Sequence, residues 1–323
     1  MHGVLLLDKP TGISSNAALQ RAKNLFRARK AGHTGSLDPL ATGMLPICFG
    51  EATKLSTYLL ASDKSYCTTA QLGVVTDSGD SDGAVIKTNS IPEPLTEQGV
   101  ESELARLRGS IEQVPPMYSA LKHQGERLYK LARQGKTVER KARSVTIHEL
   151  LLKALDNDTV TLSVRCSKGT YIRTLVEDLG QALGCGAHIT MLRRTGVDPY
   201  DGLPMLSLDE LTELQEHGGD EALDECLLPL DSALEHMPAI TLIDHEPGLF
   251  ANGGRLPLGR ERAEANAVLQ TSLRVYAEAP AGRQFLGIAE LIESGKADSA
   301  SSPATVDVAH KPLILQPKKV LNL

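Results

Sequence analysis

The chain has 323 residues, of which 41% are hydrophobic and 23% charged, so it is long enough for two domains with full cores. It contains no apolar run near the roughly 20 residues needed to span a bilayer, and its first residues lack the pattern of a secretion signal, so we expect a cytoplasmic protein with no membrane segment. Five scattered cysteines without Cys-x-x-Cys spacing, and nine histidines without a His-x-x-x-His pair near an acid, argue against a disulfide framework and against a metal site.

Charge is distributed unevenly along the chain. The net charge of −6 at pH 7 by itself argues against a nucleic-acid partner. Residues 195–254, however, contain fourteen acids and no Lys or Arg, so the remaining residues carry 34 bases against 26 acids, a net charge of +8. A positive region beside a segregated acidic segment favours an RNA-binding protein.

Apolar periodicity predicts alternating strands and helices in the first third of the chain. Strands are predicted over residues 3–7, 44–49 and 64–74, and helices from Ser14 or Ser15 to about residue 29, over 51–60 and over 95–107. The segment rich in Asp and Gly at residues 76–83 reads as a loop and lacks the full ligand pattern of a calcium site.

The loop at residues 32–43 has unusual chemistry. It contains one carboxylate, Asp38, together with three glycines that permit backbone angles closed to other residues, and Pro39 fixes φ directly after the acid. Such a loop can present Asp38 in a single pose just beyond a cationic segment, which suits a carboxylate placed against a polyanionic substrate. The alternative at this point is that Asp38 only forms a turn.

A basic segment at residues 121–143 follows the break at Pro115 and Pro116. It has eight bases and two acids, and Lys122 and Lys130 are among the bases. Such a segment can grip an RNA backbone, since Lys and Arg supply the salt-dependent part of RNA affinity. For any one of these side chains, an ordinary solvated surface is the alternative.

Residues 144–155 and 159–166 read as a hairpin, and a helix is predicted to begin at residues 168–170. Arg173 lies off the apolar stripe in the first turn of this helix, where a cation opposes the helix dipole, so we expect a carboxylate or phosphate partner for it. Arg193 and Arg194 follow a predicted strand and suit phosphate binding, although paired surface arginines are common.

In the last third of the chain, the predicted elements change from helices to short β-like runs. The acidic residues 207–234 are predicted to form two short helices. From about Met237, short β-like runs at residues 239–243, 272–277, 284–288 and 315–320 alternate with glycine-rich turns, and residues 296–305 read as a Ser/Ala-rich loop.

Five blocks of sequence, in order, resemble one known family. They are GVLLLDKPTGISS with KAGHTGSLDPLATGMLPICFGEATK (3–15 and 30–54), KSYCTTAQLGVVTDSGDSDG (64–83), PPMYSALKHQGERLYKLARQG (115–135), CSKGTYIRTLVEDLG (166–180) and GAHITMLRRTGV (186–197). The family is that of the TruB tRNA pseudouridine synthases, and the resemblance extends to about residue 197. Ser36 stands where the family more often has Thr or Ala, which is a small-for-small change.

The resemblance implies an α+β fold. It comprises a catalytic domain at residues 1–236, with a mixed, largely antiparallel sheet flanked by helices and residues 121–143 as an RNA-gripping insertion, and then a small PUA-like β-barrel at residues 237–323. The implied reaction is the isomerisation of uridine 55 to pseudouridine in the T loop of tRNA, with the T arm as partner. We expect no cofactor, no required protein partner and a monomer.

The resemblance also implies the site. Asp38 matches the family's catalytic aspartate, Tyr66 the tyrosine that packs on the target base, and Arg173 the arginine that pairs with the aspartate. His33 is expected to fill the space that the flipped base vacates. The further candidate substrate-binding residues are Lys9, Lys122, Lys130, Tyr171, Arg193 and Arg194.

Two alternatives remain at the level of sequence. One is an RNA-binding or tRNA-folding protein without catalysis, which the basic segments alone would equally support. The other is the archaeal and eukaryotic guide-RNA relative within the same superfamily, against which the plain bacterial-type layout argues.

Overall fold

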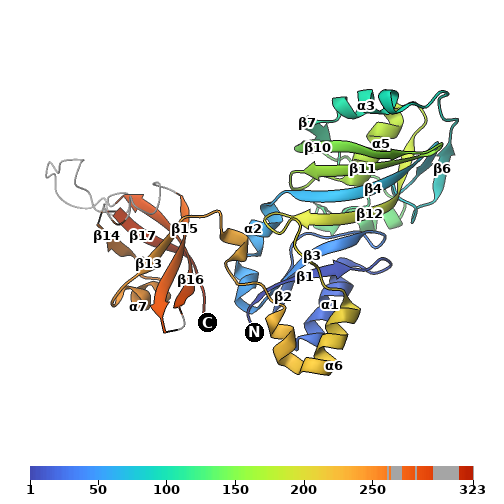
Figure 1. Ribbon diagram of the computed structural model, residues 1–323. Helices are drawn as coiled ribbons and strands as arrows, with labels where there is room; N and C mark the ends of the chain where they lie inside the picture. Colours follow the sequence, from blue (N-terminus) through green and yellow to red (C-terminus); the bar gives the residue numbers. More distant parts are fainter. Residues whose placement is uncertain (260–261, 263–270, 281, 294–312, 323) are drawn as a thin grey trace, which may run out of the picture.

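The computed structural model describes residues 1–259, 262, 271–280, 282–293 and 313–322. Among these residues, the strands form two large sheets, one of eight strands and one of five strands (Figure 1). All strands of the first sheet lie between residues 3 and 197, and all strands of the second lie between residues 239 and 320. Helices accompany a mixed sheet rather than alternating with parallel strands, which confirms the predicted α+β class.

The Asp38 loop joins two strands of the eight-stranded sheet, β2 (Ala31–His33) and β3 (Thr42–Phe49). The strands of this sheet are β1 (Gly3–Lys9), β2, β3, β4 (Lys64–Leu72), β7 (Gly109–Gln113), β10 (Arg143–Leu155), β11 (Thr159–Cys166) and β12 (Ala187–Val197). Their order is β1-β3-β12-β4-β11-β10-β7, with β2 beside β3. Only the β12–β3 pair of this described sheet is parallel, so the sheet is mixed and largely antiparallel, as expected.

The helices of the first unit each bury apolar residues. They are α1 (Ser15–Leu25), η1 (Gly50–Lys54), α2 (Ser56–Ala61), α3 (Glu97–Arg106), α4 (Leu128–Arg133), α5 (Ile172–Ala182) and α6 (Leu208–Glu225). Leu175, Val176 and Leu179 of α5 are fully buried in the central apolar cluster with β4, β11 and β12. Helix α1 begins where the Ser14 side chain accepts a hydrogen bond from Ala17 N, and it ends earlier than predicted because Arg27 adopts a φ of 46°.

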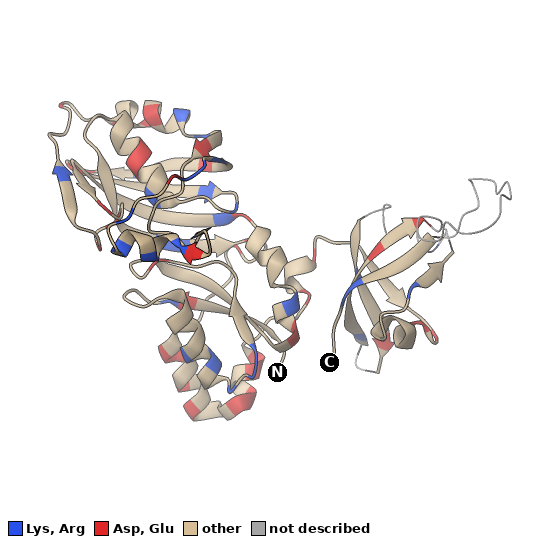
Figure 2. Cartoon of the chain, turned by 180° about the vertical axis from the view of Figure 1, so that it is seen from behind, with Lys and Arg blue, Asp and Glu red and all other residues tan. Residues whose placement is uncertain are grey.

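Two predicted elements are divided. The predicted helix at residues 51–60 is a 3-10 turn followed by the short α2, and the predicted strand at 64–74 is interrupted at Gly73, whose φ is 81°. In the acidic segment, α6 consists of two helical stretches that meet at a kink at the non-helical Gly219, as predicted, and the 3-10 turn η2 (Ser232–Leu234) follows. Acidic residues are concentrated along α6 (Figure 2).

Small paired elements complete the first unit. The hairpin β5–β6 consists of Val74–Thr76 and Val85–Thr88, and the basic segment holds β8 (Lys122–His123), β9 (Glu126–Arg127) and α4. Within the basic segment, Leu128 and Leu131 are buried while Lys122 and Lys130 are exposed.

The second sheet curls into an open half-barrel, which confirms the predicted small C-terminal β unit (Figure 1). It contains β13 (Ala239–Leu242), β15 (Ser272–Ala279), β16 (Gly282–Glu293), β17 (Leu313–Val320) and β14 (Leu256–Leu258), in that order, with α7 (Glu246–Ala251) beside them. The Ser/Ala-rich segment 296–305 lies outside the described residues. No helix among the described residues is long and apolar enough to cross a membrane.

The two units share one apolar cluster. Tyr276, Phe285, Ile288 and Leu321 of the C-terminal unit are buried with residues of β1, β3, η1, α2 and η2. A hydrogen bond also joins the two units, because Lys54 Nζ donates to Val320 O at 2.9 Å. The C-terminal unit is therefore packed firmly against the N-terminal edge of the first unit.

Candidate active site

A recess of about 310 Å³ lies between the Asp38 loop, β4, the segment 118–120 and the start of α5. Asp38, Tyr66, Tyr171, Arg173 and Arg194 all line it. Segments that are far apart in the chain thus bring together five of the residues that the sequence singled out. The recess is at the small end of the range for ligand pockets and can hold a single nucleoside.

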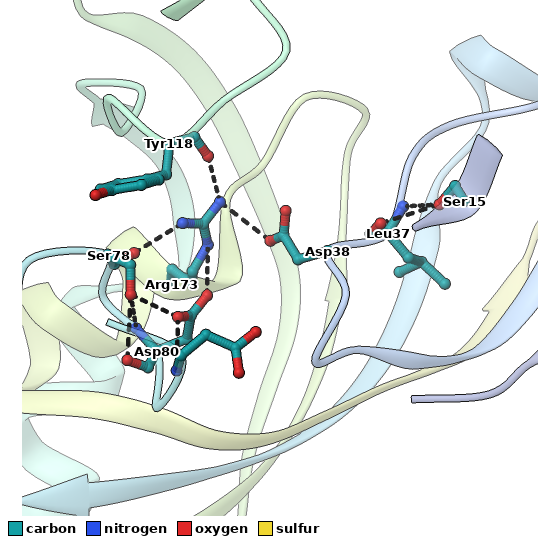
Figure 3. Close-up of polar contacts among 8 residues, drawn as sticks. Ser15, Leu37, Asp38, Ser78, Asp80, Tyr118 and Arg173 are labelled. Atoms are coloured by element: carbon teal, nitrogen blue, oxygen red, sulfur yellow. Dashed lines mark hydrogen bonds and ion pairs between the residues drawn. The ribbon is translucent and has the colours of Figure 1, made fainter. Parts of the chain in front are cut away.

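The loop that carries Asp38 is held from both sides. Ser15 Oγ accepts from Leu37 N at 2.7 Å and donates to Leu37 O at 3.0 Å, which ties the residue before Asp38 to the first turn of α1 (Figure 3). On the other side, Gly12 N donates to Pro39 O at 2.8 Å. Of the three loop glycines, Gly35 and Gly43 adopt a φ of 97°, whereas Gly32 lies in β2 without a positive φ. The expectation of special backbone angles holds for two of them.

Arg173 lies in the first turn of α5 with its side chain 5% exposed. Its Nη2 atom is 3.0 Å from Asp38 Oδ2, which confirms the predicted carboxylate partner (Figure 3). The same guanidinium donates to Ser78 O at 2.7 Å and to Tyr118 O at 2.6 Å. The planar fork is therefore fixed in orientation from three directions.

Asp80 is a second carboxylate at Arg173, and the sequence reasoning did not single it out. Its Oδ2 atom is 3.8 Å from Arg173 Nε, and its side chain is 8% exposed. Ser78 Oγ donates to the other carboxylate oxygen, which also accepts from Asp82 N. The signals in the sequence were the cluster of acids in residues 76–83, which read as an ordinary loop, and the place of Asp80 within the family-like block at residues 64–83.

Some neighbours of Asp38 raise its pKa and others lower it. The side chain is 42% exposed, because one edge faces the recess, yet protein atoms surround the rest of it. The resulting loss of hydration raises the pKa of Asp38, and Arg173 lowers it. The nearby Asp80 adds to the increase. Arg173 is therefore the main group that favours an ionised Asp38.

Tyr66 and Arg194 form the floor of the recess on neighbouring strands, where they are directly opposite each other in the β4–β12 pair. Burial raises the pKa of the Tyr66 hydroxyl, and the positive charge of Arg194 opposes this increase. Arg194 is 1% exposed and donates to Met44 O at 2.6 Å and to Gly35 O at 3.2 Å. It braces the two ends of the Asp38 loop, which corrects the expectation of a phosphate contact.

Two further sequence expectations need correction. Lys9 is fully buried, and its Nζ donates to the carbonyls of Pro10 and Ile13 at 2.8 Å and of Pro39 at 3.4 Å, so it supports the loop rather than contacting substrate. Burial lowers the pKa of Lys9 to about 8.

Arg193 lies inside β12 rather than after a strand, and it makes a two-point pair with Asp8 at 3.0 and 2.6 Å. It does not line the recess. Asp8 is far away in the chain and became a neighbour only through the β1-β3-β12 order, which the sequence alone did not show.

The remaining candidates lie around the recess. His33 ends β2 at the start of the loop 32–43, its Nδ1 atom is buried with no hydrogen-bond partner among the described residues, and burial lowers its pKa. Tyr171 lines the recess, with the Arg143 guanidinium 5.5 Å from its ring centroid. Lys122 and Lys130 are exposed on the basic segment outside the recess lining. No three His, Cys, Asp or Glu side chains within the described parts of the chain are grouped so as to hold a metal ion.

Comparison with known proteins identifies the family. A family model described as TruB family pseudouridylate synthase (N terminal domain) matches residues 23–172, and one described as tRNA pseudouridylate synthase B C-terminal domain matches residues 173–235. A protein from Stutzerimonas stutzeri, named tRNA pseudouridine synthase B, is 51% identical over 92% of this chain and 93% of its own length. The chain belongs to the TruB family.

Other relatives of this TruB family member agree. A tRNA pseudouridine synthase B from Ectopseudomonas mendocina is 55% identical over 78% of the chain and 82% of its own length. Among solved structures, a chain of a Cbf5–Nop10–Gar1 complex superposes with a TM-score of 0.70 over 98% of this chain and 84% of its own, at 22% identity. At that identity the likeness concerns the fold alone.

Proposed function

We propose that this protein isomerises uridine 55 in the T loop of tRNA to pseudouridine, with Asp38 as the catalytic carboxylate. The observation that carries the proposal is the Asp38–Arg173 ion pair at the mouth of a nucleoside-sized recess, in a chain about half identical to proteins named tRNA pseudouridine synthase B. The reaction breaks the N-glycosidic bond, turns the uracil and rejoins it through carbon. It consumes no outside group and needs no cofactor.

The geometry gives each residue a task. The target base must leave the stack of the T loop before a carboxylate can reach its glycosidic carbon. The ring of Tyr66 then receives the flipped base, with stacking worth roughly 1 to 3 kcal/mol. His33, next to the Asp38 loop, occupies the space that the base leaves in the RNA. Because Arg173 engages Oδ2 of Asp38, the other carboxylate oxygen is left for the substrate.

Binding relies on surfaces outside the recess. The exposed Lys122 and Lys130 belong to the segment that follows the recess wall at 118–120, so they are positioned for the phosphates of the T arm. We assign residues 1–236 to catalysis and residues 237–323 to a second domain that adjusts tRNA affinity. The protein acts as a monomer in the cytoplasm and needs no protein partner.

The experiment is a comparison of wild type and Asp38→Asn on an unmodified tRNA transcript, with pseudouridine mapped at single-nucleotide resolution. Asn preserves the volume of the side chain and removes its charge, so product should disappear while tRNA binding survives. Asp156→Asn, in the exposed turn between β10 and β11, is the control and should keep full activity.

The same assay separates the alternatives. A non-catalytic tRNA-folding protein would yield no pseudouridine with wild type, and a guide-dependent enzyme would yield it only after a guide RNA was added. Product formation by Asp38→Asn at a rate close to that of wild type would overturn the assignment of Asp38.

A further inference from the structure

Gln113, the last residue of β7, is 1% exposed and uses both ends of its amide on one other residue. Its Oε1 accepts from Tyr171 N at 3.0 Å, and its Nε2 donates to Tyr171 O at 3.3 Å. A buried amide with donor and acceptor satisfied on the same residue fixes that residue's position and orientation.

Tyr171 is the residue from which α5 starts. No side chain of its own caps the helix, and its carbonyl also accepts the first helical hydrogen bond, from Leu175 N at 3.1 Å. Gln113 therefore holds the N-cap residue from the neighbouring strand β7, in a helix whose own N-cap side chain makes no capping hydrogen bond.

The ring of Tyr171 is restrained as well. Arg143, whose guanidinium lies 5.5 Å from the centroid of the ring, is the direct cross-strand partner of Gln113 in the β7–β10 pair. Side chains of directly opposed strand residues lie on the same face of a sheet. Two directly opposed residues, Gln113 and Arg143, thus hold the backbone and the ring of Tyr171.

Gln113 also lies near two segments that line the recess, residues 118–120 and the start of α5. After β7 the chain continues into the wall at 118–120, whose Tyr118 O accepts from Arg173 Nη2, and Arg173 is two residues beyond Tyr171. We propose that Gln113 is a positioning residue for the reaction, which sets the start of α5 and thereby places Tyr171 and Arg173 against the substrate and Asp38. This inference rests on the proposed function.

The first test is Gln113→Met, which keeps the length of the side chain and removes both hydrogen bonds. We expect the single-turnover rate at saturating enzyme to fall by about 10- to 100-fold, as small displacements of reacting groups typically cause, with a smaller change in tRNA affinity. The control is Gln71→Met, because Gln71 also donates to backbone carbonyls, those of Leu72 and Asp158, but lies away from the recess; it should keep the wild-type rate.

The second test uses Gln113→Glu and a pH profile. A protonated carboxyl can accept from Tyr171 N and donate to Tyr171 O as the amide does, whereas the carboxylate lacks the donor. Burial raises the pKa of such a carboxyl, so its protonated form is populated at higher pH than that of an exposed glutamate. The rate of Gln113→Glu relative to wild type at the same pH should rise as the pH falls, and that of Gln113→Met should not. A flat ratio for both would contradict the positioning role.

Two readouts separate this inference from the proposed function. In an Arg173→Lys background, Gln113→Met should lose much of its effect on the rate, because both changes act through one group. Without any RNA, amide hydrogen exchange at Tyr171 should be faster in Gln113→Met than in wild type. Unchanged exchange, or a wild-type rate for Gln113→Met, overturns the inference, whereas absence of pseudouridine with wild type itself overturns the function.

Discussion

Arg173 holds several partners with one rigid group: it donates to the carbonyls of Ser78 and Tyr118, pairs with Asp38 at 3.0 Å and lies 3.8 Å from the carboxylate of Asp80. Lys would keep the charge but could not reproduce the fork. We therefore expect Arg173→Lys to lower the single-turnover rate by about 100-fold, a loss of about 2.7 kcal/mol, and Arg173→Ala to lower it further, with little change in tRNA affinity. Rates at saturating enzyme and filter-binding affinities measure the two effects.

Arg165→Lys is the matched control, since Arg165 makes a single pair with Asp198 at 2.8 Å and is 45% exposed. It should behave as wild type. If Arg173 were only a phosphate contact, its variants would bind tRNA weakly and react at a normal rate once bound, which is the result that would refute the ion-pair role.

The raised pKa of Asp38 predicts a pH dependence. The carboxylate must be ionised to act, and burial raises its pKa while Arg173 lowers it. The rate should therefore fall on the acid side at a higher pH than an ordinary aspartate would give. Removal of the cation in Arg173→Ala should move this acid limb to still higher pH. Single-turnover rates of the two proteins across pH test the direction, and an acid limb that moved to lower pH would contradict it.

Local chemistry singled out some residues of the site, and the family resemblance supplied Tyr66 and the roles of the others. Asp38 and Arg173 were singled out because a Gly- and Pro-rich loop and a cation at a helix start are each unusual locally. Lys9 and Arg193 were misassigned, since the partners that occupy them are backbone carbonyls and a carboxylate brought in by strand order. Asp80 was missed because an acid in a turn looks the same whether or not an arginine folds over it.

At the scale of elements, the Asp38 loop depends on close contact between β3 and β12. A Cβ atom at Gly43 would lie 2.2 Å from Arg194 O, in addition to the strain of a φ of 97°. Gly43→Ala should therefore destabilise the protein by about 3 kcal/mol or more. It should also abolish activity, because Arg194 can no longer brace the loop. Thermal unfolding and the tRNA assay measure both effects.

Gly32→Ala is the control in the same segment. A Cβ atom there meets nothing within 4 Å, and the residue has no positive φ. Its stability and rate should stay close to those of wild type, and an equal loss in both alanine variants would show that the contact with Arg194 is not the cause.

The basic segment predicts a salt effect. The exposed Lys122 and Lys130 provide charge without lining the recess. Replacing both by Gln should weaken tRNA binding and make its dependence on salt shallower, by a slope of about 0.7 to 0.9 per lost phosphate contact. The saturated rate should not change. Lys153→Gln, on exposed β10 surface, is the control, and identical salt slopes for all three proteins would exclude the segment from the interface.

Elements with their own periodic pattern were predictable, and boundaries set by distant contacts were not. The hairpin β10–β11 and helix α5 followed from apolar spacing, with α5 starting a few residues late because Tyr171 is held in an extended conformation. The two helices predicted in the acidic segment are the two stretches of α6 on either side of the kink at Gly219.

At the scale of the whole molecule, stability depends on the cluster shared by the two units. Leu321 is 6% exposed and packs in that cluster directly after β17. Leu321→Ala should cost about 2 kcal/mol or more and lower the melting temperature, while the single-turnover rate well below that temperature stays normal. Leu249→Ala, at a position 46% exposed on α7, should leave both unchanged.

A shorter chain tests the proposal that residues 1–236 carry out catalysis and residues 237–323 adjust tRNA affinity. A protein ending near residue 236 loses Tyr276, Phe285, Ile288 and Leu321 from the shared cluster, so we expect reduced stability and weaker tRNA binding with slow turnover. Complete loss of single-turnover activity in a shortened protein that still melts cooperatively would show that residues after 236 take part in catalysis.

The hydrogen bond from Lys54 to Val320 joins residues 266 positions apart. A ribosome adding roughly 5 to 20 residues per second needs about 13 to 53 s to make that stretch. During this time the apolar cluster that includes Leu55 and Leu59 lacks the residues that the C-terminal unit contributes to it. The edge of the first unit therefore lacks its C-terminal partner until Val320 has been made, and this edge is where a chaperone would meet the growing polypeptide.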